Sequence, residues 1–313
     1  MTIRIPFLHR DGSPVNLDTL GEDLLERLRL LRTSLFPRQV LLEIHDQRLI
    51  NQELLVGRRP GPVTIDVPLP ALTCRDGRPL EKEPLGDLIG DLLVREDLIN
   101  AQVMASLPVN AAHCRVLEWS SGESPDEPEN ALRKLDPPLD LPFPLEEAVL
   151  DLQPLPGRQR RMLLAAAPRS LVEDWIDVFN LAGVSLDRLA PAQTCQFAAL
   201  SAMLAAAPPA QLIALVDAGA EEPHLLLCRD GVPVFQRLLP EDAGQLVMEV
   251  ERSIAYLRSH DSGAATLRLL LARPFAAADQ LGRVLGVEVE TLESEPFASL
   301  VLQGLAIPEE EAP

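Results

Sequence analysis

The residues best placed to bind a charged ligand lie in the stretch 215–231, which reads LVDAGAEEPHLLLCRDG. An apolar run ends in Asp217-Ala218-Gly219 and a second apolar run follows, which is the outline of a strand–turn–strand that holds nucleotide phosphates. The turn also carries Glu221-Glu222-Pro223. Each carboxylate about 4 Å from a phosphate oxygen would cost roughly 1–4 kcal/mol, and proline removes an amide donor. The turn therefore has the outline of a phosphate loop without its chemistry.

Other catalytic or metal-binding patterns are absent from the sequence. It contains no G-x-S-x-G, H-E-x-x-H or G-x-x-x-x-G-K-[ST] motif. The histidines are scattered without metal-ligand spacing: His9, His45, His113, His224 and His260. The cysteines are also far apart, which indicates buried structural thiols: Cys74, Cys114, Cys195 and Cys228. We expect neither a metal site nor disulfides.

Composition narrows the class of protein. The 313 residues are 47% hydrophobic, as in a packed protein of more than one lobe, and no apolar run reaches the roughly eighteen residues of a membrane span. The formal charge of −19 and the aromatic content of 4% disfavour nucleic-acid binding. The N-terminus, MTIRIPFLHRDGSP, has no apolar core of a signal peptide, so we expect a cytoplasmic protein.

The elements that must position this turn have a counterpart earlier in the chain. The first set is a strand pair over Val40–Ile50 that turns near His45–Gln47, strands at 64–67 and 102–106, and a helix at 85–94. The second set is strands at 212–216, 224–228, 234–237 and 267–271, and a helix at 242–259. A hairpin, a third strand and a helix thus occur twice. This internal duplication predicts two similar lobes around a cleft.

The remaining patterns surround these two sets. Leu20, Leu24, Leu28 and Leu31 share one face of a leading amphipathic helix, and a proline-rich acidic segment fills 120–144. A helix over 170–181 has Ser170 as its expected N-cap and Gly183 as its stop. The other expected elements are strands at 148–153, 162–166 and 287–291, helices at 129–135, 194–206, 276–285 and 297–304, and a basic turn at 158–161.

Four stretches, in this order, resemble the bacterial PilM family, an actin-like component of type IV pilus assembly: VPLPALTCRDGRPLEKEPLGDLIGDLL, LPFPLEEAVLDLQPL, MLLAAAPRSLVEDWIDVFNLAGVSLDRLAP and IALVDAGAEEPHLLLCRDGVPVFQRLLP. The resemblance implies an α/β, actin-like fold of two RNase H-like lobes with a small βα insert in the first lobe. The expected parts are an N-terminal extension (1–38), the start of the first lobe (39–108), the insert (109–186), a first-lobe return helix (187–210), the second lobe (211–306) and an acidic tail (307–313).

Of the three turns that the family uses for nucleotide, the first and third have lost their glycines, and the second keeps Asp217-Ala218-Gly219 but has Glu221-Glu222-Pro223 in place of the hydroxyls. The first turn, Asp-x-Gly-Ser-Ser in the family, is Glu43-Ile44-His45-Asp46-Gln47 here, and the third, glycine-rich in the family, is Leu271–Ala276 without glycine. Amides approach phosphate closely only where no Cβ intrudes. The resemblance therefore implies a vestigial nucleotide pocket without cofactor: Glu43, His45, Asp46, Asp217, Gly219, Glu221 and Glu222. Asp46 and Asp217 are the carboxylates placed where an actin-like enzyme would handle magnesium.

By this resemblance the chain is a non-catalytic scaffold at the cytoplasmic face of the inner membrane. It would bind the N-terminal peptide of a PilN-type membrane protein in a groove between first lobe and insert, and contact motor components or further copies of itself. One alternative is an active ATPase or small-molecule kinase that binds ATP and magnesium, with Arg48 and Arg273 supplying positive charge. Another is the actin-like component of type II secretion, which normally continues into a membrane span, whereas this sequence ends at Pro313.

Overall fold

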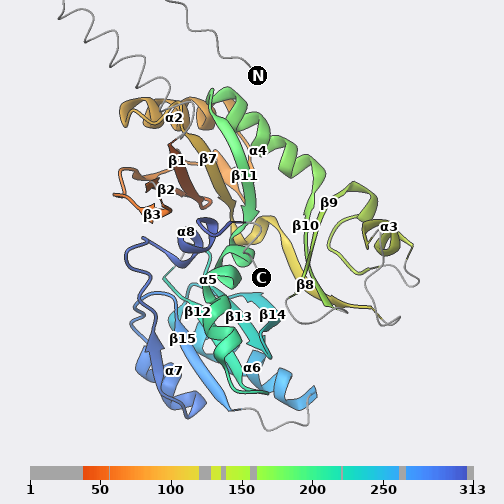
Figure 1. Cartoon of the computed structure of the whole chain (residues 1–313). Helices are drawn as coiled ribbons and strands as arrows, with labels where there is room; N and C mark the ends of the chain where they lie inside the picture. Colours follow the sequence, from red (N-terminus) through yellow and green to blue (C-terminus); the bar gives the residue numbers. More distant parts are fainter. Residues whose placement is uncertain are drawn as a thin grey trace, which may run out of the picture. The chain divides into compact units, whose positions relative to one another are not determined.

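The computed structural model describes residues 38–55, 57–119, 128–134, 139–155, 161–219, 221–260 and 266–308, all within one compact unit, Arg38–Pro313 (Figure 1). The expected leading helix and the end of the acidic tail lie outside these residues. Within the described ranges, no helix combines the length and the apolar character needed to cross a membrane.

The first lobe is built on a mixed sheet in the order β11-β7-β1-β2-β3, and β4 also pairs with β2. β1 and β2 form the expected hairpin, antiparallel from Gln39↔Leu54 to Ile44↔Leu49. β7 pairs with β1 in parallel, and β11 pairs with β7 in parallel. The strands are β1 (Gln39–Ile44), β2 (Arg48–Leu55), β3 (Arg59–Pro60), β4 (Asp66–Pro68), β7 (Gln102–Leu107) and β11 (Ser185–Pro191). A two-stranded ribbon of β5 (Cys74–Arg75) and β6 (Arg78–Pro79) lies between β4 and the first helix in sequence.

The second lobe repeats this topology. Its sheet has the order β14-β13-β12-β15-β16, with an antiparallel hairpin followed by two parallel strands. The elements are β12 (Leu212–Asp217), β13 (His224–Arg229), β14 (Val232–Leu238), α6 (Ala243–His260), β15 (Leu267–Leu271), α7 (Ala278–Leu285) and β16 (Val289–Thr291). Each lobe thus places its hairpin turn at the same end of its first strand. The predicted duplication is confirmed.

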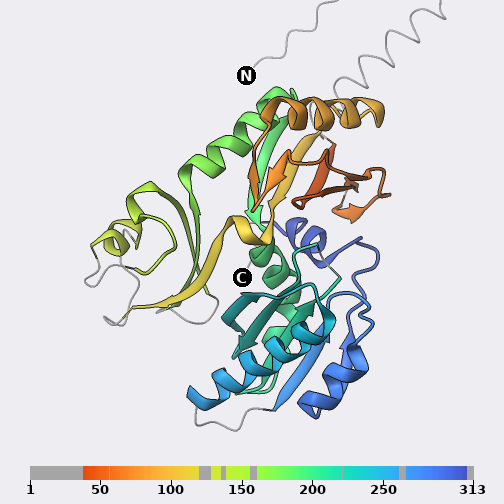
Figure 2. The ribbon, with the colours of Figure 1, turned by 180° about the vertical axis from the view of Figure 1, so that it is seen from behind.

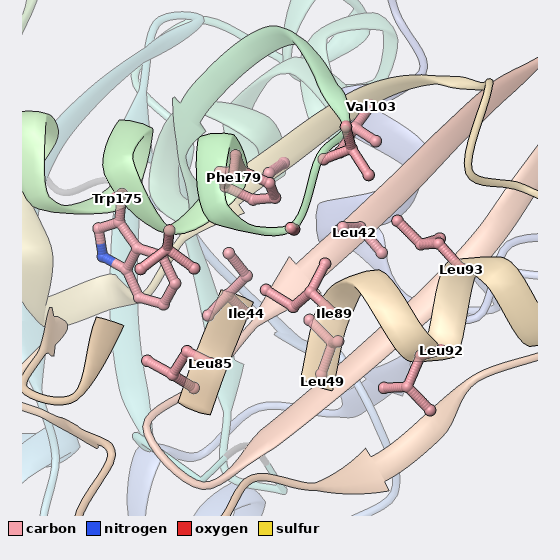
Figure 3. Close-up of a cluster of buried hydrophobic side chains, with 14 of the residues drawn as sticks. Leu42, Ile44, Leu49, Leu85, Ile89, Leu92, Leu93, Val103, Trp175 and Phe179 are labelled. Atoms are coloured by element: carbon pink, nitrogen blue, oxygen red, sulfur yellow. The ribbon is translucent and has the colours of Figure 1, made fainter. Parts of the chain in front are cut away.

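Two helices cover the first-lobe sheet and form its core. α2 (Lys82–Arg95) and α4 (Arg169–Leu181) pack against each other and against the β1–β2 hairpin. Figure 3 shows Trp175 and Phe179 of α4 facing the leucine and isoleucine side chains of α2 and the hairpin. Burial of these apolar side chains is the main driving force for folding of the first lobe.

A smaller three-stranded sheet, β8-β10-β9, projects beside the first lobe (Figure 2). It comprises β8 (His113–Glu118), β9 (Ala148–Pro154) and β10 (Arg161–Pro168), with the short helix α3 (Pro128–Arg133) beside it. These elements are the insert. The structure ends the insert at Pro168 rather than at Leu186, because the apolar face of α4 is buried in the first-lobe core and β11 pairs with β7.

Two further helices connect the lobes. α5 (Ala192–Ala206) packs Ala192 and Cys195 against the first lobe, to which the sequence assigned it, and Phe197, Leu200 and Leu204 against the second-lobe sheet. α8 (Leu300–Leu305), assigned to the second lobe, packs against β1, β2 and β7 of the first. The helices also pack against each other, so each lobe buries a helix that follows the last strand of the other.

One helix cap differs from the expectation. α4 begins at Arg169, and its N-cap is Pro168, whose extended backbone continues directly from β10. Ser170 therefore lies in the first turn, where its Oγ accepts a hydrogen bond from Arg78 (3.1 Å) instead of capping the helix. The C-terminal stop is confirmed, since Gly183 has a φ of +69°.

Candidate functional site

The turns between β1 and β2 and between β12 and β13 face each other across the two lobes. The first turn is held by a hydrogen bond from the amide of His45 to the carbonyl of Arg48 (2.9 Å). The second turn follows directly after the buried Asp217 and carries the two glutamates. The fold therefore brings the two sequence-predicted turns into direct contact.

The carboxylates of the second turn occupy the backbone amides of the first. The amide of Asp46 donates to Oε1 of Glu222 (3.0 Å), and the amide of Gln47 donates to Oε2 of Glu221 (2.9 Å). Carboxylate oxygens are good acceptors for turn amides for the same reason that phosphate oxygens are. The two glutamates stand here in the role that anionic phosphate oxygens would take. The amides of this turn are thus already satisfied from within the chain.

His45 lies buried between two carboxylates. Its Nδ1 is 3.2 Å from Oε2 of Glu222, and its Nε2 is 3.1 Å from Oε1 of Glu43. Burial by itself would lower the pKa of His45, but the hydrogen bonds to Glu222 and Glu43 outweigh it and raise the pKa to about 10. The imidazole is therefore protonated at neutral pH and forms an ion pair with each carboxylate.

The two carboxylates beside His45 stay ionised. Burial would raise the pKa of each, yet the hydrogen bonds from His45 hold both values below the usual range. Glu43, which is 1% exposed, also accepts a hydrogen bond from the hydroxyl of Ser299. Ser299 is the N-cap of α8, so this contact joins the first turn to the connecting helix.

Asp217 is paired with an arginine rather than left open for a ligand. Nε of Arg273 lies 3.0 Å from Oδ1 of Asp217, and another guanidinium nitrogen lies 3.8 Å from Glu43. The same side chain covers Gly219, since a Cβ added to that glycine would lie 2.8 Å from Cδ of Arg273. Arg273, which belongs to the third turn, therefore fills the space beside the second turn.

Asp46 faces into its own lobe. Its carboxylate accepts hydrogen bonds from the amides of Asp76 (2.7 Å) and Gly77 (2.8 Å) and from the side-chain amide of Asn110 (3.3 Å). Arg48 forms a bidentate pair with Asp66 at 2.7 Å for each contact. Both side chains thus stabilise first-lobe loops.

Little space remains between the turns. The cavity bounded by His45, Gln196, Asp217 and His224 measures about 10 Å³, which is at the lower limit for one water molecule. Among the described residues, the donor atoms of His45, Glu221 and Glu222 all lie within 4.8 Å of one another, which is close enough to hold a metal ion. The proton on His45 occupies the lone pair that such an ion would need.

The sequence identified most of this cluster but not its partners. Glu43, His45, Asp217, Gly219, Glu221 and Glu222 come together, whereas Asp46 lies to one side with only its amide in the contact. The sequence did not predict three of the polar contacts: Ser299 with Glu43, Gln196 with Asp217, and His224 with Gln196. Glu43 and His45 at the end of an apolar strand are the signal that could have indicated a buried ion pair.

A groove lies on one side of the insert, against the first lobe. Its volume is about 250 Å³, and it runs between β9 and β10 of the insert and β11 and α5. Small or aliphatic side chains form much of the lining, including Ala165, Ala167 and Leu189. Asp151, Asp187 and Arg188 also line it. We call it the alanine groove.

The comparisons with known proteins bear on the fold. No family model matches the sequence, and no curated protein matches it. A solved structure described as the PilM-PilN type IV pilus biogenesis complex is 22% identical, with a TM-score of 0.69, over 86% of this chain and 97% of that chain. A Bacteroides thetaiotaomicron protein with an actin-like ATPase fold and unknown function is 8% identical, with a TM-score of 0.54, over 86% and 95%. The chain has the actin-like fold.

Proposed function

We propose that this chain is a nucleotide-independent scaffold of a pilus assembly machine, with the alanine groove as the seat for a partner peptide. The observation that carries the proposal is the occupation of the Asp46 and Gln47 amides by Glu222 and Glu221. A nucleotide would have to displace both carboxylates and would leave them beside its own negative charges, at a cost of roughly 1–4 kcal/mol for each contact. The chain closes its own nucleotide pocket, so its function lies in protein contacts rather than in ATP hydrolysis.

The fold-level likeness to a PilM–PilN complex supports the choice of partner. The partner would be the cytoplasmic N-terminal peptide of a PilN-type inner-membrane protein, and the scaffold would be held at that membrane through it. The alanine groove suits a short segment with an apolar anchor, because alanine side chains leave room for larger ones.

Calorimetric titration of the chain with a synthetic N-terminal peptide of the PilN-type partner tests this function. We expect saturable binding that is the same with and without magnesium ATP. Ala165→Phe should abolish it, because Ala165 lines the groove and a phenyl ring there would occupy the space of the anchor. Val284→Phe, at a 43% exposed position of α7, should bind like the wild type.

Two results would contradict the proposal. One is peptide binding that requires ATP, which would return the chain to the nucleotide-dependent class. The other is equal binding by the wild type and Ala165→Phe, which would move the peptide out of the alanine groove.

A further inference from the structure

The alanine groove runs along the free side of a sheet as well as over the insert. β11 is the terminal strand of the first-lobe sheet, and β7 is the one described strand that pairs with it. Figure 1 shows this margin of the sheet on the side of the insert strands β9 and β10. A terminal strand presents backbone amides and carbonyls that lack a partner strand. The groove therefore offers hydrogen-bonding groups in addition to small apolar side chains.

The residues that line the groove distinguish the edge of one sheet from the face of the other. Side chains of a strand alternate between the two faces of its sheet, so a cavity on one face is lined by every second residue. β9 follows this rule, since it contributes Val149, Asp151 and Gln153. β11 instead contributes the consecutive residues 187–191. The groove thus lies over a face of the insert sheet and along the open side of β11.

The open side of β11 is not covered by another strand. Among the described elements, those in extensive contact with β11 are its pairing strand β7 and the helices α4 and α5, which precede and follow it in the chain. The strands of the insert are not among them. Asp187 is exposed, and Arg188 and Leu189 are half-buried, so this edge remains accessible. A peptide backbone could therefore reach it through the groove.

The regular part of β11 is short. Its register with β7 shifts between Leu186 and Arg188 and then continues without interruption to Pro191. Pro191 has no amide hydrogen, and its carbonyl already accepts a hydrogen bond from the hydroxyl of Thr194 (2.8 Å). An added strand would therefore pair over about three or four residues, which is the lower end of ordinary strand lengths.

One carboxylate of the groove is free to select a ligand. Asp187 lies at the register shift of β11 and is exposed, and no described residue forms an ion pair or a hydrogen bond with its side chain. The guanidinium of the neighbouring Arg188 is engaged, because it donates to the carbonyls of Leu305 (3.4 Å) and Ile307 (2.9 Å). Asp187 is thus the group at this edge that can pair with a basic side chain.

We infer that the partner peptide binds the alanine groove as an extended segment that adds a short strand to the open side of β11. This inference rests on the proposed function and specifies how that site recognises its ligand. Main-chain hydrogen bonds to β11 provide affinity, and side chains on one face of the peptide contact Ala165 and Ala167 of the insert. A basic side chain of the peptide pairs with Asp187, which makes this residue a determinant of specificity.

Calorimetric titration with two N-methylated versions of the synthetic partner peptide tests the strand addition. One version carries N-methyl groups on the odd-numbered amides of the bound segment, and the other carries them on the even-numbered amides. Successive amides of a strand point to opposite sides, so one set faces β11 and the other does not. We expect one version to bind at least about tenfold more weakly than the unmodified peptide, and the other to bind nearly as tightly.

A charge reversal tests the role of Asp187. Asp187→Lys should bind the unmodified peptide about fivefold more weakly, because an attractive contact at an exposed position becomes repulsive. A peptide whose basic side chains are changed to glutamate should prefer Asp187→Lys to the wild type. Asp91→Lys, at an exposed position of α2 outside the groove lining, makes the same change in net charge and is the matched control.

Three outcomes would count against this inference. Equal affinities of the two N-methylated versions would overturn strand addition, while binding of the unmodified peptide would leave the proposed function intact. Equal losses in Asp187→Lys and Asp91→Lys would reduce the charge effect to the net charge of the protein and overturn the role of Asp187. A complete absence of binding by the unmodified peptide would reject the proposed function together with this inference.

Discussion

At the scale of single residues, the protonated His45 is the centre of the contact between the turns. A buried ion pair is a weak source of net stability, but removal of one partner leaves uncompensated buried charge. His45 neutralises two carboxylates of low exposure, Glu43 from its own lobe and Glu222 from the other. His45 is therefore the cation that pairs a carboxylate of each lobe, while Arg273 adds a longer contact with Glu43.

We expect His45→Gln to lower the free energy of unfolding by about 3–5 kcal/mol, because Glu222 then loses its cationic partner and Glu43 keeps only the longer contact with Arg273. Urea denaturation followed by circular dichroism measures this loss. The matched control is Arg48→Gln in the same turn, whose ion pair with Asp66 is about half exposed and should be worth less than about 1 kcal/mol. Equal losses in the two variants would show that His45 has no special role.

The same residue predicts a dependence of stability on pH. The pKa of His45 is about 10 in the folded chain against 6.5 in the unfolded chain, so the folded state binds the proton more tightly. Its contribution is therefore complete below pH 6.5 and is lost as the pH rises toward about 10. The lowered pKa values of Glu43 and Glu222 act in the opposite direction, with stability lost on acidification. Stability should thus be greatest between the two limits.

Denaturation curves of the wild type and His45→Gln between about pH 7 and pH 10 measure this term. The difference between the two proteins should shrink as the pH rises. Three thiols also contribute to the pH dependence in this range, because burial raises their pKa values in the folded chain whereas they ionise in the unfolded chain: Cys114, Cys195 and Cys228. This contribution is common to both proteins. A difference that stays constant with pH would contradict a protonated His45.

At this scale, the sequence indicated which turns matter but not how they pair. The sequence predicted that the glutamates at 221–222 disfavour phosphate binding, and residue types were sufficient for that prediction. Their hydrogen bonds to the Asp46 and Gln47 amides are contacts across 174 and 176 residues. No local pattern encodes such a contact, because it arises from the packing of one lobe on the other.

At the scale of elements, the crossing of α5 and α8 holds the lobes together. A Cβ added to Gly304 of α8 would lie 1.7 Å from the carbonyl oxygen of Cys195 in α5. The two backbones can approach this closely only because Gly304 has no side chain. The hydroxyl of Ser299 at the start of α8 contacts Glu43, so the position of this helix also fixes the ion-pair cluster.

We therefore expect Gly304→Ala to destabilise the chain by about 3 kcal/mol, at the upper end of the cost of overpacking, because neither helix backbone can yield locally. Gly244→Ala in α6 is the matched control. Its Cβ would have only an ordinary contact, 3.4 Å from Asp242, so it should be neutral or slightly stabilising. Thermal denaturation distinguishes the two. Equal melting temperatures would show that α5 and α8 separate at little cost.

Periodicity predicted most elements within a few residues but not the partners of the helices. The strand predicted at 267–271 is β15 to the residue, and the duplicated hairpins are both present. By contrast, the neighbours of α4 and α8 differ from the prediction, because an apolar helix face indicates burial without specifying against which sheet. Only the tertiary structure shows that α8 packs on the first lobe and that α5 packs on both lobes.

At the scale of the whole molecule, the chain holds its two lobes together without a ligand. Two carboxylate–amide contacts and the ion pairs His45–Glu222 and Arg273–Glu43 join the first lobe to the second. The proposed peptide site in the alanine groove would then be available without a nucleotide. This arrangement supports the proposed role of a nucleotide-independent scaffold.

Calorimetric titration of the nucleotide-stripped wild-type chain with magnesium ATP tests this claim most directly. We expect no saturable heat at up to about 1 mM ATP, from a protein whose circular dichroism and melting curve show that it is folded. Saturable binding in the micromolar range, with a matching rise in melting temperature, would contradict the account. It would mean that Glu221 and Glu222 leave the Gln47 and Asp46 amides when ATP is present.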